Sequence, residues 1–273
     1  MEASSHLRNR TSNKAKSILS LQGVSRRFVT TRQNTTALED ISFDVYEGEF
    51  ICIVGPSGGG KSTLLNIVAG LDFPDKGTVT FEDKPVKGPS PERIVVFQEA
   101  ALLPWLNVRQ NVEFGLKLRG VKGAALKEAV DRGLELVNLS RFDRAFAHEL
   151  SGGMKQRVQL ARALTAGPRM LLMDEPFAAL DAQTRDILQL ELQEIWAKTG
   201  TTILFVTHNV REAAVLADRV LVMTPSPGRI KIEILIDLPR LRSIDSHAIV
   251  DIAAQVRDQL QNDGAHVRTG ASE

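Results

Sequence analysis

The sequence predicts an α/β fold in which a parallel sheet is combined with an antiparallel β subdomain and an inserted helical subdomain. Short continuous apolar runs at residues 50–54, 170–173 and 202–206 are typical of parallel strands that are covered on both faces. Segments with the helical period of apolar residues follow these runs. The alternation of such strands with helices predicts an α/β fold with a parallel sheet.

The amino-terminal region predicts the antiparallel subdomain. Residues 1–17 are polar with dispersed Lys and Arg, and we expect a disordered tail there. Residues 18–21 and 41–45 alternate in the period of a strand, and a stretch rich in Thr, Asn and Gln separates them. Residues 77–81 indicate another short strand. These segments together predict an antiparallel sheet.

The later elements follow in order. Residues 93–97 predict a core strand that ends at Gln98. From about residue 107 to residue 166 the apolar period is helical, which predicts the inserted helical subdomain. A stripe from Ile249 to Leu260 predicts an amphipathic carboxy-terminal helix, and residues 263–273 should fray. The other expected elements are helices over 182–198 and 209–217 and strands over 220–223 and 230–236.

A glycine-rich turn lies between the strand at 50–54 and a helical segment that begins near residue 64. Strand, glycine-rich turn and helix are the context that a phosphate-binding loop (P-loop) requires, because glycines let backbone N–H groups approach phosphate oxygens. Lys61 could reach the β- and γ-phosphates, and the Ser62 hydroxyl could hold Mg²⁺. The predicted loop consists of Gly55, Pro56, Ser57, Gly58, Gly59, Gly60, Lys61, Ser62 and Thr63.

Polar side chains at two other strand ends complete the predicted chemistry. Asp174 ends an apolar strand, where a carboxylate could hold Mg²⁺, and Glu175 could polarise the attacking water. The alternative is a charged strand end without a function. His208 follows the strand at 202–206 and differs from the other histidines only by this position, since a lone histidine is more often structural.

A second glycine-rich helix start occurs at Ser151, Gly152 and Gly153. A hydroxyl, exposed N–H groups and a helix dipole form an anion cradle, although a simple helix cap would have the same composition. One nucleotide hardly needs two cradles in one chain. If two subunits meet head to tail, each cradle closes on the nucleotide of its neighbour.

At this point the motifs resemble those of a known family. Residues 150–154 are similar to the signature motif of ATP-binding cassette (ABC) ATPases, and the resemblance covers about residues 18–240. Met154 departs from the commoner glutamine at the last signature position. Matching motifs in family order are the P-loop at 55–63, the Q-loop glutamine Gln98, the Walker B run 170–174 with Glu175, the D-loop 178–181, the switch histidine His208 and Phe28, an adenine-stacking aromatic.

The resemblance implies roles for these residues. Ser62, Gln98 and Asp174 would hold or sense Mg²⁺, and Glu175 would be the general base. His208 would contact the γ-phosphate, with Gln98 completing the catalytic group. Ser151, Gly152 and Gly153 would bind the γ-phosphate of ATP across a homodimer, and Asp181 would communicate between subunits.

Composition limits the compartment and the partners. Lys plus Arg (34) balance Asp plus Glu (33), so no broad basic field favours nucleic acid. The single cysteine, Cys52, excludes an intrachain disulfide. Neither an uncharged apolar stretch of membrane-spanning length nor a signal peptide is found. We therefore expect a cytoplasmic protein that lies peripherally on the inner face of the cell membrane.

The resemblance implies an ATP-hydrolysing importer subunit, with residues 18–240 as the nucleotide-binding domain, a helical subdomain at about 100–166, and a helix and tail at 241–273. Its partners would be a twin subunit, integral membrane permease subunits and, indirectly, a periplasmic or lipoprotein substrate-binding protein. Two other hypotheses stay open: a soluble ABC ATPase that acts on nucleic acid or ribosomes, and a regulator that binds ATP without hydrolysing it.

Two stretches resemble one branch of importers. Residues 97–105 and 223–230 are similar to segments of the nitrate, sulfonate and taurine importers. Leu102, Leu103 and Trp105 would line the groove that receives a permease helix, or would pack the helical subdomain instead. The cargo stays open among nitrate, an alkyl sulfonate, taurine, bicarbonate and a pyrimidine precursor.

Overall fold

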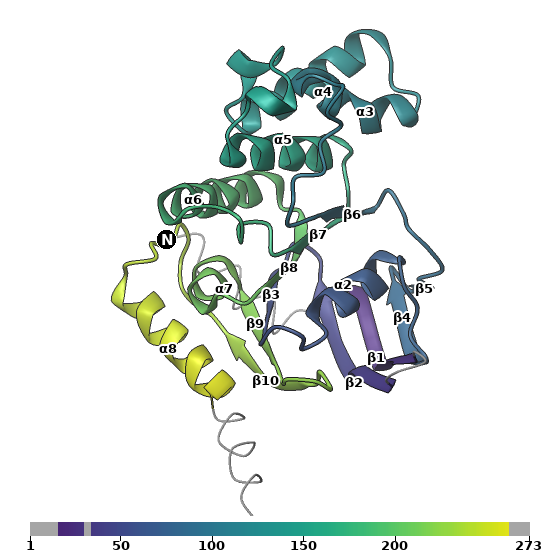
Figure 1. Ribbon diagram of the computed structural model, residues 1–273, viewed down its shortest axis with the longest axis vertical. Helices are drawn as coiled ribbons and strands as arrows, with labels where there is room; N and C mark the ends of the chain where they lie inside the picture. Colours follow the sequence, from purple (N-terminus) through teal and green to yellow (C-terminus); the bar gives the residue numbers. More distant parts are fainter. Residues whose placement is uncertain (1–15, 30–33, 262–273) are drawn as a thin grey trace, which may run out of the picture. The chain divides into compact units, whose positions relative to one another are not determined.

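The computed structural model describes residues 16–29 and 34–261 of the chain (Figure 1). The chain divides into two compact units. Unit 1 comprises Met1–Ser90 and Thr202–Glu273, and unit 2 comprises Pro91–Thr201. Most of the expected amino-terminal tail and the expected frayed end at 263–273 lie outside the described residues, and the other predicted domain boundaries stay predictions.

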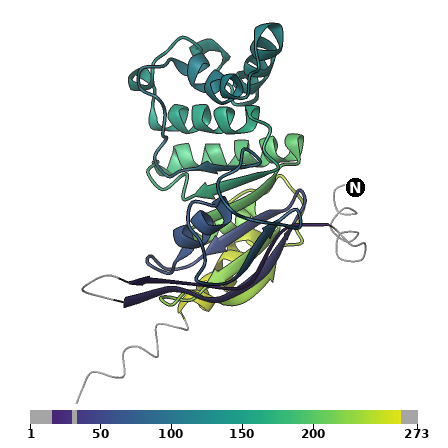
Figure 2. The ribbon, with the colours of Figure 1, turned by 90° about the vertical axis from the view of Figure 1, so that its right-hand side faces the viewer.

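Unit 1 contains a four-stranded antiparallel sheet in the order β2-β1-β4-β5. The hairpin of β1 and β2 is longer than the sequence indicates. Pairing continues into the polar stretch as far as Val29↔Asn34, and Figure 2 shows the two strands running side by side. Hydrogen bonds between backbones extend the hairpin here, because they do not require apolar side chains. The strands are β1 (Ser17–Val29), β2 (Asn34–Tyr46), β4 (Lys76–Phe81) and β5 (Lys84–Pro85).

Unit 1 also contains the predicted parallel strands. β3 (Phe50–Val54) lies between β8 (Thr202–Thr207) and β9 (Arg219–Met223) and is parallel to both. All residues of these three strands are buried, which explains their continuous apolar runs. β10 (Ile230–Leu235) pairs antiparallel with β9.

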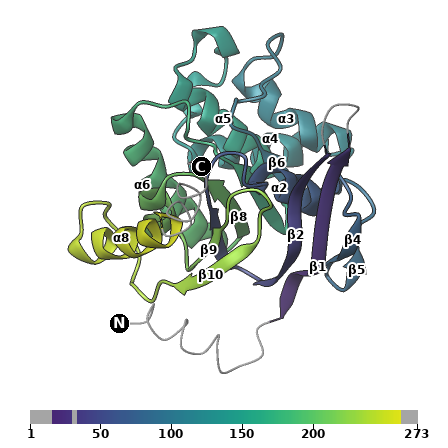
Figure 3. The same cartoon turned by 60° about the horizontal axis from the view of Figure 1, so that its bottom comes forward.

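Three helices accompany the parallel strands of unit 1. α2 (Lys61–Ala69) follows β3 directly, and α7 (Val210–Leu216) follows β8. α8 (His247–Gln261), the yellow helix in Figure 3, is the predicted amphipathic helix. It packs on α7 and β9, and Ile249 and Val256 are buried on it.

Unit 2 combines two parallel strands with the predicted helical insertion. β6 (Arg93–Val96) pairs with β7 (Met170–Asp174). Within this unit, α5 lies between the pair α3–α4 and α6 (Figure 1). The helices are α3 (Val108–Leu118), α4 (Gly123–Leu136), α5 (Gly152–Thr165) and α6 (Ala182–Thr199), with single turns at Ser140–Phe142 and Ala147–Glu149. The predicted fold class is therefore confirmed.

Candidate functional site

The P-loop joins β3 to α2, and two separate features require glycine at position 60. Gly60 precedes α2 with φ of 83°, a conformation that favours glycine. A Cβ on Gly60 would also lie 2.5 Å from the carbonyl oxygen of Ala37. Since the N-cap residue Gly60 has no side chain, it makes no side-chain hydrogen bond to the first N–H groups of α2. The loop thus has the backbone of an anion cradle.

Lys61 brings a positive charge to this cradle. Its side chain is buried, and Nζ donates hydrogen bonds to the carbonyl oxygens of Gly55 and Pro56, both at 3.0 Å. Ser57, Gly58 and Ser62 are exposed on the loop. The ammonium is therefore fixed inside the loop, while other loop groups face solvent, as phosphate binding requires.

His208 lies at the same sheet edge as the P-loop. β3 and β8 are in register with Val54 opposite Thr207, so Gly55 and His208 follow from neighbouring strand ends. The Thr207 hydroxyl donates to Glu212 at 2.6 Å and accepts from the backbone N–H of Asn209 at 3.0 Å. These bonds shape the turn that leaves His208 exposed. Unit 1 therefore brings the predicted P-loop and switch histidine together.

Unit 2 brings the Q-loop and the Walker B carboxylates together in the same way. Val96 of β6 pairs with Met173 of β7, so Gln98 and Asp174 emerge at one edge of this strand pair. Glu175 has φ of 44°, an uncommon conformation for a residue with a side chain. Strained backbone of this kind is concentrated at functional sites, because it is tolerated where side-chain direction matters.

The signature residues begin α5, next to the D-loop. Ser151 caps the helix, with Oγ accepting from the backbone N–H of Met154 at 3.3 Å. A Cβ on Gly153 would lie 2.6 Å from Cγ2 of Thr184, so close packing against α6 requires glycine there. Asp181 caps α6 by accepting from the N–H of Thr184 at 3.0 Å, a bond that holds the pKa of this carboxyl below its usual range.

Gln156 belongs to none of the sequence motifs, yet it contacts one of the predicted site residues. Its Nε2 donates a 2.7 Å hydrogen bond to the backbone oxygen of Gln98, and its side chain is buried. The bond connects the signature helix to the Q-loop within unit 2. A glutamine at a buried position of an amphipathic helix was the available signal, but its partner is 58 positions away in the chain.

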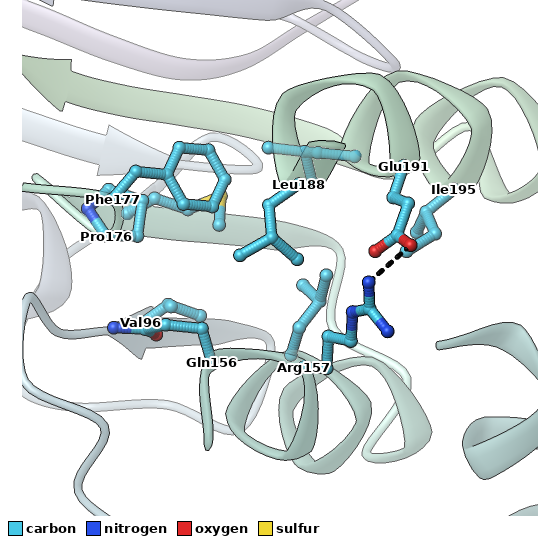
Figure 4. Close-up of a pocket in the computed structure, with 11 residues that line it drawn as sticks. Val96, Gln156, Arg157, Pro176, Phe177, Leu188, Glu191 and Ile195 are labelled. Carbon is cyan, nitrogen blue, oxygen red and sulfur yellow. Dashed lines mark hydrogen bonds and ion pairs between the residues drawn. The ribbon is translucent and has the colours of Figure 1, made fainter. Parts of the chain in front are cut away.

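The seam between α5 and α6 encloses an apolar cavity of about 20 Å³ (Figure 4). This volume holds about one water molecule, so the cavity is too small for a nucleotide. At its side, Arg157 and Glu191 form an ion pair at 2.7 Å. Burial raises the pKa of Glu191, and the charge of Arg157 opposes that shift.

Phe28 lies in β1 beneath a guanidinium group. The Arg26 side chain is 4.9 Å from the centre of the Phe28 ring. Asp72 and Asp75 hold Arg26 in ion pairs at 2.8 and 2.9 Å. Phe28 is 39% exposed. The ring is therefore supported from one side by a fixed cation and retains accessible surface for stacking.

The residues predicted for Mg²⁺ have suitable chemistry. Among residues 16–29 and 34–261, no group of three or more His, Cys, Asp or Glu side chains could hold a metal ion by itself. Mg²⁺ commonly takes one or two carboxylates together with substrate phosphates and waters, so a site of this kind does not need such a group. Ser62, Gln98 and Asp174 each carry a side-chain oxygen, the kind of ligand that this cation prefers, and their role at a metal stays a prediction.

The sequence matches the ABC transporter family over residues 38–178, more than half of the chain. The chain belongs to the ABC transporter family. The nitrate import ATP-binding protein NrtD of Synechocystis is 47% identical over 221 residues, which cover 81% of this chain and 83% of the relative. The taurine import ATP-binding protein TauB of Chromobacterium violaceum is 50% identical over 198 residues, 72% of this chain and 76% of the relative.

A solved structure supports the same conclusion. The dimeric ATP-binding cassette MJ0796, in a post-hydrolysis state with ADP and Pi, matches with a TM-score of 0.70 and 30% identity over 80% of this chain and 98% of that chain. This ABC chain is an ATPase of the import-type branch, as predicted. Within the described part of the chain, no helix combines the length and apolar character needed to cross a membrane. The roles of individual site residues stay predictions.

Proposed function

We propose that this ABC ATPase works as a homodimer in which each nucleotide binds between the P-loop of one subunit and the signature residues of the other. The observation that carries the proposal is the amino terminus of α5. Ser151 and Gly152 are exposed there, at a helix start with the positive end of its dipole. A dimeric cassette with ADP and Pi among the structural neighbours supports this arrangement.

In the proposed site, the P-loop N–H groups and Lys61 bind the β- and γ-phosphates of ATP. Ser62, Asp174 and Gln98 would hold Mg²⁺, which neutralises phosphate charge when bound. Glu175 accepts a proton from the attacking water as general base. His208 contacts the γ-phosphate, and the partner subunit's Ser151 and Gly153 complete its surroundings.

The same proposal includes a membrane permease as the partner of unit 2. Trp105 is 70% exposed, so it does not pack the interior of the helical subdomain. Asn111 holds the preceding segment: its Oδ1 accepts from the N–H of Leu103 at 2.9 Å, and its Nδ2 donates to the oxygen of Leu103 at 3.2 Å. A fixed loop that exposes an indole is suited to receive a permease helix.

Uptake of a small anion or organic solute of the nitrate or taurine type is the proposed role of the assembly. The named import functions of NrtD and TauB support it. The permease and a substrate-binding protein would select the solute, and the ATPase would lie on the cytoplasmic face of the membrane. Co-purifying the permease and measuring uptake of nitrate, taurine and an alkyl sulfonate in vesicles would identify the cargo.

Glu175→Gln tests the ATPase mechanism. We expect the variant to bind Mg-ATP and dimerise but to lose turnover by about 10²- to 10⁴-fold, because the amide cannot accept the proton. Light scattering with Mg-ATP measures dimerisation, and a phosphate-release assay measures turnover on the same samples. Wild-type turnover in Glu175→Gln would remove the assignment of the general base.

A strictly monomeric wild-type protein with full turnover would contradict the shared site. The wild-type assay also separates the other hypotheses. Absence of phosphate release would favour the ATP-binding regulator, whereas salt-sensitive binding of DNA or RNA would favour a nucleic-acid ATPase.

A further inference from the structure

Residues 224–229, between β9 and β10, lie beside the P-loop, and the site described above does not use them. Val54 at the end of β3 pairs with Val222 of β9 as well as with Thr207 of β8. The P-loop is therefore flanked by the turn of His208 on one side and by the 224–229 segment on the other.

The 224–229 segment is attached to β2. The N–H of Gly228 donates to the oxygen of Ala37 at 2.9 Å, and the N–H of Glu39 donates to the oxygen of Gly228 at 3.0 Å. Arg229 and Glu39 add an ion pair at 2.7 Å. Ser226 donates through Oγ to the oxygen of Thr36 at 3.1 Å. The segment therefore extends the edge of β2 and has a defined position.

The attached segment packs against P-loop backbone at glycine positions. A Cβ on Gly228 would lie 2.2 Å from the carbonyl oxygen of Gly59, and one on Gly59 would lie 3.0 Å from the oxygen of Thr224. Neither glycine has φ in the left-handed region. Contact between the two backbones, and not the conformation of either, is what requires glycine here.

The Thr224 hydroxyl closes the segment on itself. Oγ1 donates to the oxygen of Pro227 at 2.9 Å and accepts from the N–H of Arg229 at 3.0 Å. The backbone N–H of Thr224 also donates to the oxygen of Arg229 at 3.0 Å. The Thr224 side chain thus stabilises the turn that places Gly228 against Gly59, together with the bonds to β2.

We propose that the 224–229 segment positions the P-loop, and that Gly228 and Thr224 are positioning residues for phosphate binding. This inference rests on the proposed role of the P-loop. Displacing Gly59 would turn loop N–H groups away from the phosphates, which are bound by charge-assisted hydrogen bonds. The effect therefore falls on nucleotide affinity, and less on turnover at saturation.

Gly228→Ala tests the positioning role. We expect the Kd for ATP and ADP and the KM for ATP to rise about tenfold or more, which corresponds to the loss of one hydrogen bond to a charged group. The value of kcat should change less. The control is Gly115→Ala in α3, where a Cβ would meet nothing within 4 Å. Titration of a fluorescent ATP analogue, with thermal unfolding of each variant, provides the readout.

A folded Gly228→Ala protein with wild-type affinities would overturn the inference. If Gly228→Ala does not fold, the ATP affinities of Thr224→Val and Thr224→Ser test the positioning role instead. The valine variant loses the hydroxyl and should bind ATP several-fold more weakly, whereas serine should restore affinity. Equal wild-type affinity of both variants would also overturn the inference. Failure of the wild-type protein to bind ATP would instead contradict the proposed function.

Discussion

Several predicted site residues have a local structural role in addition to the proposed chemical one. Ser151 and Asp181 each cap a helix through a side-chain oxygen. Gly153 is required by its close approach to Thr184, and Gly60 by its φ and its contact with Ala37. For Ser151, the structure therefore shows the helix cap that was the simpler of the two interpretations. A loss of activity on mutation at these positions must be separated from a loss of stability.

Phe28 is the site residue whose surroundings give the most specific expectation. Phe28→Ala should raise the Kd for ATP by about tenfold, because base stacking on an aromatic ring contributes about 1–3 kcal/mol. Phe28→Tyr should keep wild-type affinity, and Arg26→Gln should have an intermediate effect, since Arg26 supports the ring. Equilibrium titration with ATP measures all three.

Phe142→Ala is a matched control, since Phe142 is 46% exposed and lies outside the proposed site. If Phe28→Ala binds ATP as tightly as Phe142→Ala does, Phe28 is not the adenine platform.

At the scale of elements, the packing of α5 on α6 connects the signature residues to the D-loop. The amino ends of the two helices meet where Gly153 faces Thr184. Farther along, Arg157 and Glu191 join the same helices. Gln156 ties α5 to the Q-loop. Unit 2 therefore holds three of the predicted motifs in one packed arrangement.

A double-mutant cycle separates the two roles of Gly153. Gly153→Ala should lower the free energy of unfolding by about 1–3 kcal/mol through overpacking against Cγ2 of Thr184. Adding Thr184→Ser removes that methyl group and should restore most of the stability. ATPase activity should stay low in the double variant, because a residual displacement at the start of α5 still moves the N–H groups that are proposed to bind the phosphate.

Urea unfolding gives the stability, and phosphate release gives the activity, of the wild type, the two single variants and the double variant. Thr184→Ser alone is the control. Recovery of both stability and activity in the double variant would show that Gly153 serves packing only.

At the scale of the whole molecule, a buried ion pair lies at the end of the parallel strands away from the P-loop. Arg219 at the start of β9 contacts Glu49 through Nε at 2.7 Å and Nη2 at 3.1 Å. Burial raises the pKa of Glu49, although the charge of Arg219 opposes the shift. Burial by itself would lower the pKa of Arg219, but the negative charges of Glu49 and then Glu233 outweigh burial and leave this pKa raised. Desolvation therefore outweighs attraction for Glu49.

This shift predicts the pH dependence of stability. Because the folded pKa of Glu49 lies above its ordinary value of 4.5, its titration contributes stability that is complete below that pH and is lost as the pH rises through the folded pKa. The unfolding free energy of the wild type, minus that of Glu49→Gln, should therefore fall from pH 4.5 towards neutrality. Urea unfolding at several pH values measures it, and a difference that rises with pH would contradict the assignment.

The sequence by itself determined the fold class, the family and the strand ends that carry polar groups. These features depend on short stretches whose period or composition is local, such as the apolar run 170–173 and the glycine-rich loop 55–63. The length of the β1–β2 hairpin was underestimated, because its outer pairs are polar and are held by backbone hydrogen bonds.

Only the tertiary structure decided which distant residues support the predicted site. Gln156 donates a hydrogen bond to Gln98, and Gly228 packs against Gly59. Arg26 lies over the Phe28 ring, and ion pairs with Asp72 and Asp75 hold it there. None of these pairings has a period or a motif, because each depends on the folded path of the backbone that brings the two chain segments within a few ångströms. Local chemistry therefore determined what the site contains, and non-local packing decided how its residues are held.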